Sequence, residues 1–273
     1  MTAVTRAYAE VDGRQLHYRI AGGTDGPWLL LLHQAPSTSA MYLPLMSALA
    51  PRYRMLAPDL PGFGGSDGLP DGADIAGFAA AITALLDVLG IERCKMFGHH
   101  TGAAVAVQLA AEQPGRCDAL ALCGPPLLTA AQRASLPAQV EAFPFAADGS
   151  HLQEWWQRFQ AKEEDAPPAL IQRELLSALS AGDTYQGTYR AVCAQDFAAL
   201  LPGISCPVLV LAGDADPLHG AVAGTLALLP QGRQGTLPAG AGTYACERHT
   251  PALAAQLSEF FDNEPMAISA AKG

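Results

Sequence analysis

The fold is decided by residues 96–107, which read Met-Phe-Gly-His-His-Thr-Gly-Ala-Ala-Val-Ala-Val (MFGHHTGAAVAV). An apolar strand end, a turn framed by Gly98 and Gly102, and a run of small helix-forming residues follow one another without a break. A chain that turns this sharply from strand to helix strains its central residue and pushes that side chain outward, so glycines are needed at the flanks. The central residue is His100. The stretch predicts a strand, a tight turn and a helix, with an imidazole presented at the turn.

Short apolar strands alternate with helical stretches on both sides of this turn. Residues 7–21 predict a hairpin around Asp12-Gly13, a dipeptide that favours positive φ. Further strands are predicted at 28–32, 54–59, 94–97, 119–123 and 207–212 with an edge strand at 234–237, and helices at 75–89, from 103 onward and at 251–261. Unbroken apolar strands that alternate with helices indicate a mostly parallel sheet covered on both faces. A site is expected beyond the carboxyl ends of the strands.

One segment interrupts this alternation. Residues 126–200 contain Trp155, Trp156 and helical periods but no apolar strand run. The segment predicts a helical lid, inserted before the late strands, over a core made of residues 1–125 and 201–273. Extra packing helices with no role in covering a site are the alternative.

Composition excludes several classes of protein. A chain of 273 residues with 50% hydrophobic and 15% charged residues is long enough for one large α/β domain with an insertion. The net charge is −10 and the 16 Lys and Arg are scattered, which argues against nucleic acid or an anionic membrane as partner. Six cysteines without a CxxC pair, and an N-terminus without a secretory signal, predict reduced thiols and a cytoplasmic location. Apolar runs such as 28–32 are too short to span a bilayer.

Five pieces in order resemble the α/β-hydrolase superfamily, in its lidded small-molecule branch. They are HQAP (33–36), DLPGFGGS (59–66), the elbow GHHTG (98–102), GDADP (213–217) and GAGT (240–243). The resemblance covers most of the chain outside the predicted lid. It implies an α/β-hydrolase fold, and an oxyanion hole made by the backbone N–H groups of Gln34 and Thr101.

Two of the three catalytic positions that the resemblance implies carry other residues. His100 stands where the family has its nucleophilic serine, and Thr243 stands where it has the general-base histidine. Asp216 matches the acid position by its spacing from Gly213, with Asp214 as the weaker candidate.

An imidazole at the elbow reaches farther than a serine hydroxymethyl group, and Thr243 leaves space beside Asp216. We therefore expect His100 to act as a general base, polarised by Asp216 directly or through Thr243 or a water. A nucleophilic role through a labile acyl-imidazole is the alternative.

A histidine base without a serine suits two chemistries. It activates water for hydrolysis of an ester, a lactone or a C–C bond in a small, partly apolar carbonyl compound, or it moves a proton in a lyase, decarboxylase or isomerase. A catalytically inactive ligand-binding member of the same family is a third reading. Hydrolysis is the first choice, because the family resemblance favours it.

Four further residues are predicted to contact the substrate: His33, His151, Trp155 and Trp156. For His33 the alternative is a loop anchor, and for the other three it is the start and core of a packing helix. No metal is expected, because the histidines lack metal-ligand spacing and adjacent His99 and His100 should point in different directions. No glycine-rich nucleotide motif follows a strand, so a cofactor-free site is predicted. The partner is a small-molecule substrate, and the chain is either a monomer or a homodimer.

Overall fold

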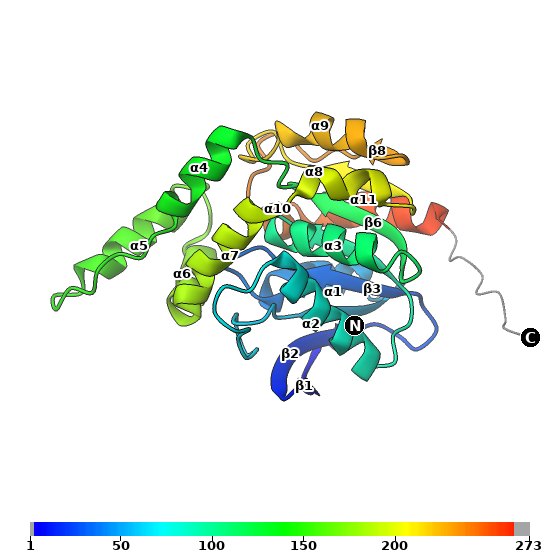
Figure 1. The fold of residues 1–273 in the computed structure, drawn as a ribbon, viewed down its shortest axis with the longest axis horizontal. Coiled ribbons are helices and arrows are strands. Elements are labelled where there is room, and N and C mark those ends of the chain that lie inside the picture. Colours follow the sequence, from blue (N-terminus) through cyan, green and yellow to red (C-terminus); the bar gives the residue numbers. More distant parts are fainter. Residues whose placement is uncertain (1–2, 265–273) are drawn as a thin grey trace, which may run out of the picture.

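An eight-stranded sheet forms the centre of the molecule (Figure 1). Its strands are β1 (Thr5–Val11), β2 (Arg14–Ala21), β3 (Trp28–Leu32), β4 (Arg54–Pro58), β5 (Cys94–His99), β6 (Cys117–Cys123), β7 (Val208–Leu211) and β8 (Gly232–Gln234). They lie in the order β1-β2-β4-β3-β5-β6-β7-β8. The β1–β2 and β2–β4 pairs are antiparallel and all other neighbours are parallel. The computed structural model describes residues 3–264, so residues 1–2 and 265–273 of the predicted core lie outside it.

Helices cover both faces of the sheet, as predicted. One face carries the 3-10 helix η1 (Ser39–Tyr42), α1 (Leu43–Leu49), α10 (Ala245–Arg248) and α11 (Thr250–Asn263). The other carries α2 (Ile75–Val88), α3 (Thr101–Glu112), α8 (Phe197–Leu200), the 3-10 helix η2 (Leu201–Gly203) and α9 (Ala221–Leu228). The sheet thus separates two apolar cores, and the predicted α/β-hydrolase architecture is confirmed.

Local sequence signals explain most element boundaries. The hairpin turns at Asp12 (φ 51°) and Gly13 (φ 74°), as the dipeptide predicts. Asp74 caps α2 by accepting a hydrogen bond from Gly77 N–H at 2.9 Å, and Gly90 (φ 67°) follows the end of that helix. Residues 28–32 form a parallel strand whose last four residues are buried, because both faces of the sheet are covered.

The last strand differs from the prediction. It spans Gly232–Gln234 rather than 234–237, and its three residues are all exposed. Its position is set by backbone pairing with β7, which aligns Val208 with Gly232. An exposed three-residue edge strand has no apolar pattern, so the sequence carried no signal for its register.

Two helices also begin earlier than predicted. The helix expected from residue 103 starts at Thr101, and the closing helix expected at 251–261 spans Thr250–Asn263.

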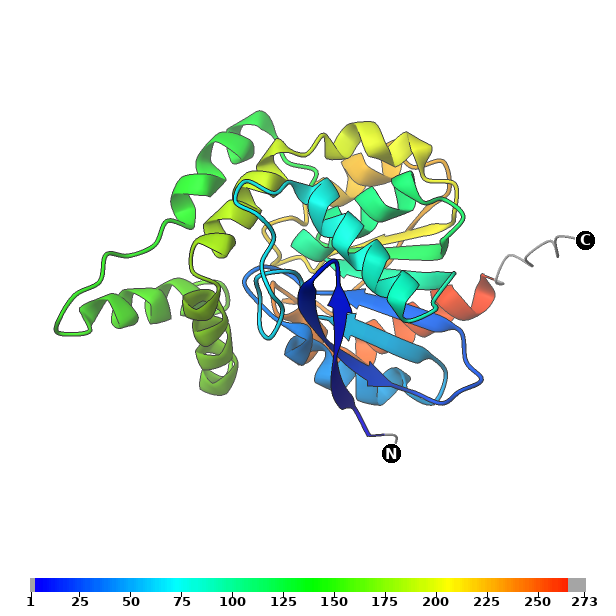
Figure 2. The ribbon, with the colours of Figure 1, turned by 60° about the horizontal axis from the view of Figure 1, so that its bottom comes forward.

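The segment between β6 and β7 is helical. It contains α4 (Ala130–Gln139), α5 (Ser150–Gln160), α6 (Pro168–Ala181) and α7 (Asp183–Ala194), followed by α8, which packs against α3. Figures 1 and 2 show α4 to α6 at one end of the sheet, on the left of both views. The predicted helical insertion is present, whereas its exact limits at 126 and 200 stay a prediction. Within residues 3–264, no helix is both long and apolar enough to cross a membrane.

The predicted strained turn joins β5 to α3. His100 adopts φ 49° and ψ −110°, a conformation that a residue with a side chain rarely takes. A Cβ atom at Gly98 would lie 2.4 Å from the carbonyl oxygen of Gly102, and one at Gly102 would lie 1.9 Å from the carbonyl oxygen of Leu32. Both flanking residues must be glycine because backbone atoms occupy the space of any side chain.

We predict that Gly102→Ala lowers the free energy of unfolding by about 3 kcal/mol or more, because the added methyl group meets backbone that cannot move aside. Gly187→Ala is the matched control. It lies within helix α7 with no atom closer than 3.9 Å to the added methyl group, so it should be neutral or stabilising by up to about 1 kcal/mol. Urea unfolding of both variants measures the difference, and equal midpoints would contradict the packing argument.

Candidate active site

The site is centred on a contact between His100 and Asp216. His100 lies at the elbow, and Asp216 lies in the loop that follows β7. The imidazole Nε2 is 2.8 Å from Asp216 Oδ2, and the two side chains are 15% and 0% exposed. The other carboxylate oxygen, Oδ1, accepts a hydrogen bond from Leu218 N–H at 2.7 Å. Both oxygens of Asp216 are therefore engaged, and the carboxylate is held in one orientation.

This contact defines which nitrogen of His100 can act as a base. An ionised carboxylate only accepts hydrogen bonds, so Nε2 carries the proton and the lone pair lies on Nδ1. Nδ1 has no hydrogen-bond partner among residues 3–264. In the usual serine triad the carboxylate holds Nδ1 and Nε2 is the base. Here the carboxylate contacts the other ring nitrogen.

Gly124, immediately after β6, sets the position of the ring. Its φ of 60° and its closeness to the imidazole both require glycine, since an added Cβ would lie 2.2 Å from His100 Cδ2 and 2.4 Å from Nε2. The ring edge that bears Nε2 thus packs against Gly124 backbone. The opposite edge, which bears Nδ1, is left for another contact.

The charges of the pair follow from burial and from mutual attraction. Burial lowers the pKa of His100, and His99 and Lys162 lower it further, while Asp216 opposes them. Burial alone would raise the pKa of Asp216, but the charge and hydrogen bond of His100 outweigh it and bring that pKa to about 2. At neutral pH the imidazole is neutral and the carboxylate is ionised. That is the state in which Nδ1 accepts a proton.

Two backbone amides lie at the same edge of the sheet. Thr101 is the first residue of α3 and Gln34 follows β3, and neither N–H has a backbone partner within the described residues. Thr101 Oγ1 accepts a hydrogen bond from Ala35 N–H at 3.3 Å, which joins the two segments. Free N–H groups at a helix start favour negative charge. The two predicted oxyanion donors thus have no backbone partner within the described residues and belong to segments that this hydrogen bond joins; Thr101 lines the smaller cavity, whereas Gln34 lines neither cavity.

Two cavities meet at His100. The smaller, of about 120 Å³, is lined mainly by apolar side chains that include Leu128 and Val192. The larger, of about 430 Å³, is lined by both apolar and polar side chains, and the polar ones include Lys162 and Thr243. Both are also lined by Leu136, Tyr189 and Pro217. His100 therefore lies between a mainly apolar cavity and a mixed cavity that also contains cationic side chains.

Thr243 is buried and lines the larger cavity, and its hydroxyl makes no hydrogen bond within the described residues. His100 contacts Asp216 directly, so Thr243 does not bridge the two side chains.

His33 is fully buried, and both of its ring nitrogens already have hydrogen-bond partners. Its Nδ1 is 2.7 Å from the carbonyl oxygen of Gln34, and its Nε2 accepts a hydrogen bond from Leu60 N–H at 2.8 Å. The ring joins the loops after β3 and β4, which is the anchoring role. It has no nitrogen left for the substrate contact predicted for it.

His151, Trp155 and Trp156 lie in the helical insertion and line neither cavity. His151 Nδ1 accepts a hydrogen bond from Ala146 N–H at 3.2 Å. Trp155 stacks on Phe159 with ring centroids 5.9 Å apart. The alternative of a helix start with packing tryptophans describes these contacts, because the amphipathic helix α5 buries its aromatic face against the other insertion helices.

Sequence reasoning missed Tyr185 and Tyr189, which line the larger cavity. They lie four residues apart on α7, so they share one helix face. That spacing was the available signal. It could not show that this face looks toward His100.

One argument against a metal site is wrong. The rings of His99 and His100 do not point apart, since their centroids are 4.4 Å apart. Both rings and Asp216 each offer a ligand atom, and these atoms lie within 4.8 Å of one another. The unusual backbone of His100 turns the two neighbouring side chains to one side. These three residues are the ones that could hold a metal ion, and the expected absence of metal stays a prediction.

The chain belongs to the alpha/beta hydrolase fold family, whose profile matches residues 27–242. It is similar to an uncharacterized hydrolase of Saccharomyces cerevisiae, YNR064C, at 37% identity over 107 residues, which are 38% of this chain and 37% of that protein. The chain spans about a third of the length of the curated relatives that it matches first.

Solved structures agree over nearly the whole chain. A hydrolase from Pseudomonas aeruginosa superposes with a TM-score of 0.79 at 26% identity, covering 94% of this chain and 98% of that one. An enol-lactonase from Burkholderia xenovorans superposes with a TM-score of 0.72 at 24% identity, covering 94% and 100%. The second likeness supports the fold alone.

We predict that nitrogen-15 NMR of the histidine rings finds His100 neutral at pH 7, with its proton on Nε2 and a pKa below 6.5. Asp216→Asn should lower this pKa further, because the carboxylate is the group that raises it. Asp214→Asn is the control, since Asp214 is exposed and contacts Gly240 N–H instead. A proton on Nδ1 at neutral pH would contradict the assignment of the base.

Proposed function

We propose that this chain is a cofactor-independent hydrolase that uses His100 as a general base to activate water against a small, partly apolar ester or lactone. The observation that carries the proposal is the 2.8 Å contact between His100 Nε2 and Asp216 Oδ2. It leaves Nδ1 as the basic nitrogen, between two cavities and at the edge of the sheet where two amides have no backbone partner within the described residues. Base, substrate space and oxyanion donors then lie at one edge of the sheet.

The proposed reaction needs no covalent intermediate. Nδ1 of His100 takes a proton from water as the water oxygen bonds to the substrate carbonyl carbon. The resulting oxyanion accepts hydrogen bonds from the N–H groups of Gln34 and Thr101. Asp216 stabilises the imidazolium through Nε2–H. When the tetrahedral species collapses, the bond to the leaving oxygen breaks and Nδ1–H returns its proton to that oxygen.

A base role explains the site better than a nucleophilic role. An acyl group on Nδ1 would need a second base to activate the water that removes it. Thr243 occupies the position where the family has its histidine, so no such base stands opposite His100. Direct attack by water requires only the residues that are present.

We predict that His100→Ala and Asp216→Asn each lower kcat for 4-nitrophenyl ester or enol-lactone hydrolysis by roughly 10²- to 10⁴-fold. The asparagine amide donates to Nε2 and thereby forces the proton onto Nδ1, so the base is lost without a change in size. Asp214→Asn is the matched control and should keep the wild-type rate.

The pH profile follows from the direction of the pKa shift of His100. The base works only when unprotonated, so the rate should fall as the pH drops through a value below 6.5 and should be level at neutral pH.

A chelator should leave the rate unchanged. Turnover of β-keto acids with CO₂ release, and not of esters, would replace hydrolysis by proton transfer. No turnover of any of these compounds, or full activity in His100→Ala, would mean that the elbow histidine is not catalytic.

We also predict that Gly124→Ala lowers kcat by roughly 10²-fold, because its methyl group would displace the imidazole from Asp216. Gly90→Ala is the control for backbone strain. Its φ of 67° is similar, but no atom lies within 4 Å of the added methyl group. Both variants should lose about 1–2 kcal/mol of stability from the positive φ. Equal ester hydrolysis rates in the two variants would contradict the positioning role of Gly124.

A further inference from the structure

Lys162 is a cation without a carboxylate partner beside the candidate active site. It follows the end of α5, is half-buried, and lines the larger cavity together with His100 and Thr243. Its Nζ lies 4.9 Å from the centre of the Phe159 ring and makes no ion pair or hydrogen bond within residues 3–264. Because a partly desolvated ammonium without a partner is costly, its position calls for an explanation.

The acidic residues that follow Lys162 form ion pairs with another residue. Glu163 and Asp165 both pair with Arg248 of α10. Asp165 makes a two-point contact with that guanidinium, at 2.6 and 2.7 Å. Glu163 also accepts a hydrogen bond from Tyr244 N–H at 2.5 Å. This charge cluster joins the insertion to the core and leaves Lys162 out.

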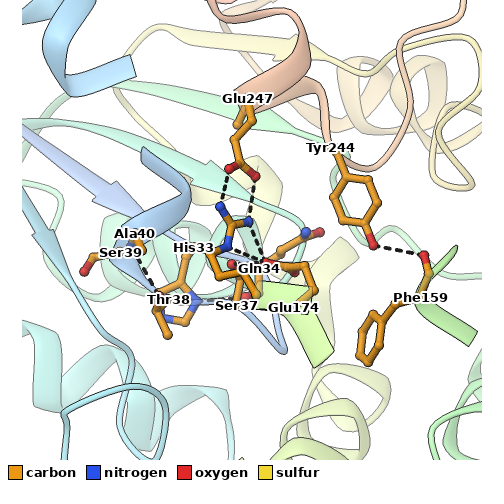
Figure 3. Close-up of polar contacts among 12 residues, drawn as sticks. His33, Gln34, Ser37, Thr38, Ser39, Ala40, Phe159, Glu174, Tyr244 and Glu247 are labelled. Atoms are coloured by element: carbon orange, nitrogen blue, oxygen red, sulfur yellow. Dashed lines mark hydrogen bonds and ion pairs between the residues drawn. The ribbon is translucent and has the colours of Figure 1, made fainter. Parts of the chain in front are cut away.

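A second arginine pairs with two further acidic residues, Glu174 and Glu247, which are labelled in Figure 3. Arg173 contacts both oxygens of Glu247 and lies 2.7 Å from Glu174 Oε1. Glu174 is buried and also accepts a hydrogen bond from Ser37 Oγ at 2.8 Å. Glu174 is close enough to favour the charged form of Lys162, against burial and Arg158, which together lower the lysine pKa. The contacts of Glu174 with Arg173 and Ser37 all use Oε1, and its buried Oε2 has no hydrogen-bond partner within the described residues, yet it forms no ion pair with Lys162.

The larger cavity is therefore cationic. Arg158 and Lys162 line it, and neither Asp nor Glu is among its lining residues. The guanidinium of Arg158 packs over the Phe143 and Trp155 rings, at 3.9 and 4.7 Å, and donates to the carbonyl oxygen of Glu141. It also has no carboxylate partner within the described residues. In a chain with a net charge of −10, two such cations in one cavity are a local exception.

We propose that Lys162, supported by Arg158, binds a carboxylate of the substrate. The inference rests on the proposed function and narrows it to an ester or lactone that carries a free carboxylate on one side of the reacting carbonyl. The carboxylate would lie toward Lys162 and an apolar group in the smaller cavity beside Val192. His100 lines both cavities, which puts the carbonyl between the two groups. Lys162 is then a substrate-binding residue that fixes orientation.

The kinetic experiment compares mono-4-nitrophenyl glutarate with 4-nitrophenyl pentanoate, which differ mainly in the terminal carboxylate, after subtraction of the uncatalysed rates. Wild type should prefer the glutarate ester in kcat/KM. Lys162→Gln should reduce this preference roughly ten- to a hundredfold, as expected for one charge-assisted hydrogen bond, and Lys162→Arg should keep most of it. Added salt should weaken the preference in wild type.

Arg190→Gln is the matched control. Arg190 is exposed on α7, and the variant removes the same charge from the insertion without touching either cavity that His100 lines. It should keep the wild-type preference. The Lys162 side chain makes no hydrogen bond within the described residues, so its substitution breaks none. Thermal unfolding checks that each variant is folded. A preference that Lys162→Gln leaves unchanged, or that Arg190→Gln reduces equally, overturns the assignment.

A binding experiment separates the two proposals. Calorimetry with glutarate, which contains no bond to hydrolyse, should show binding to wild type and to His100→Ala, and binding at least tenfold weaker to Lys162→Gln. If glutarate binds in this way but no ester is turned over, the anion site stands and the hydrolase proposal fails. If esters are hydrolysed through His100 but Lys162→Gln changes neither glutarate affinity nor the preference for the glutarate ester, the hydrolase proposal stands and the anion site fails.

Discussion

The structure depends on a close approach of two backbones. Gly102 lies against the carbonyl oxygen of Leu32, and Gly98 lies against that of Gly102, so α3 begins directly over the edge of the sheet. This packing forces the strained conformation of His100. It also places the start of α3 beside the loop after β3, where Thr101 and Gln34 have free N–H groups. One steric constraint therefore fixes His100 and the start of α3 at the edge of the sheet where the loop after β3 lies.

In the proposed mechanism, the two departures from the family pattern compensate each other. A serine at the elbow needs a histidine on the opposite loop, because a hydroxyl is a weak nucleophile without a base. Here the imidazole itself occupies the elbow and reaches Asp216 directly. Thr243 leaves the space that a second imidazole would fill, and Gly124 leaves the space for the ring. The acid position is kept because a neutral imidazole still needs a partner that orients it.

The charged residues around the site fall into two groups: those that form ion pairs and those that have no carboxylate partner within the described residues. Arg173 and Arg248 join the insertion to α10 through three carboxylates, which are Glu247, Glu163 and Asp165, and Arg173 also pairs with its neighbour Glu174 on α6. The cations left over, Lys162 and Arg158, both line the cavity beside His100. The acidic residues near the cavity are thus paired with arginines, and no Asp or Glu among the described residues lines the cavity itself. The proposed role of Lys162 uses this arrangement to select anionic compounds.

The amino-acid sequence by itself determined the elbow, the alternation of strands and helices, and the helical character of the insertion, because these depend on glycine positions and apolar periodicity. It also pointed to His100 and Asp216 as candidates, through order and spacing along the chain. Only the tertiary structure decided which nitrogen of His100 meets Asp216, that His33 is saturated, and that Trp155 packs internally rather than lining a cavity. The same holds for β8, whose register comes from pairing with β7, and for Lys162, whose isolation depends on distant arginines. Such features depend on contacts between residues far apart in the chain, and local sequence patterns carry no record of them.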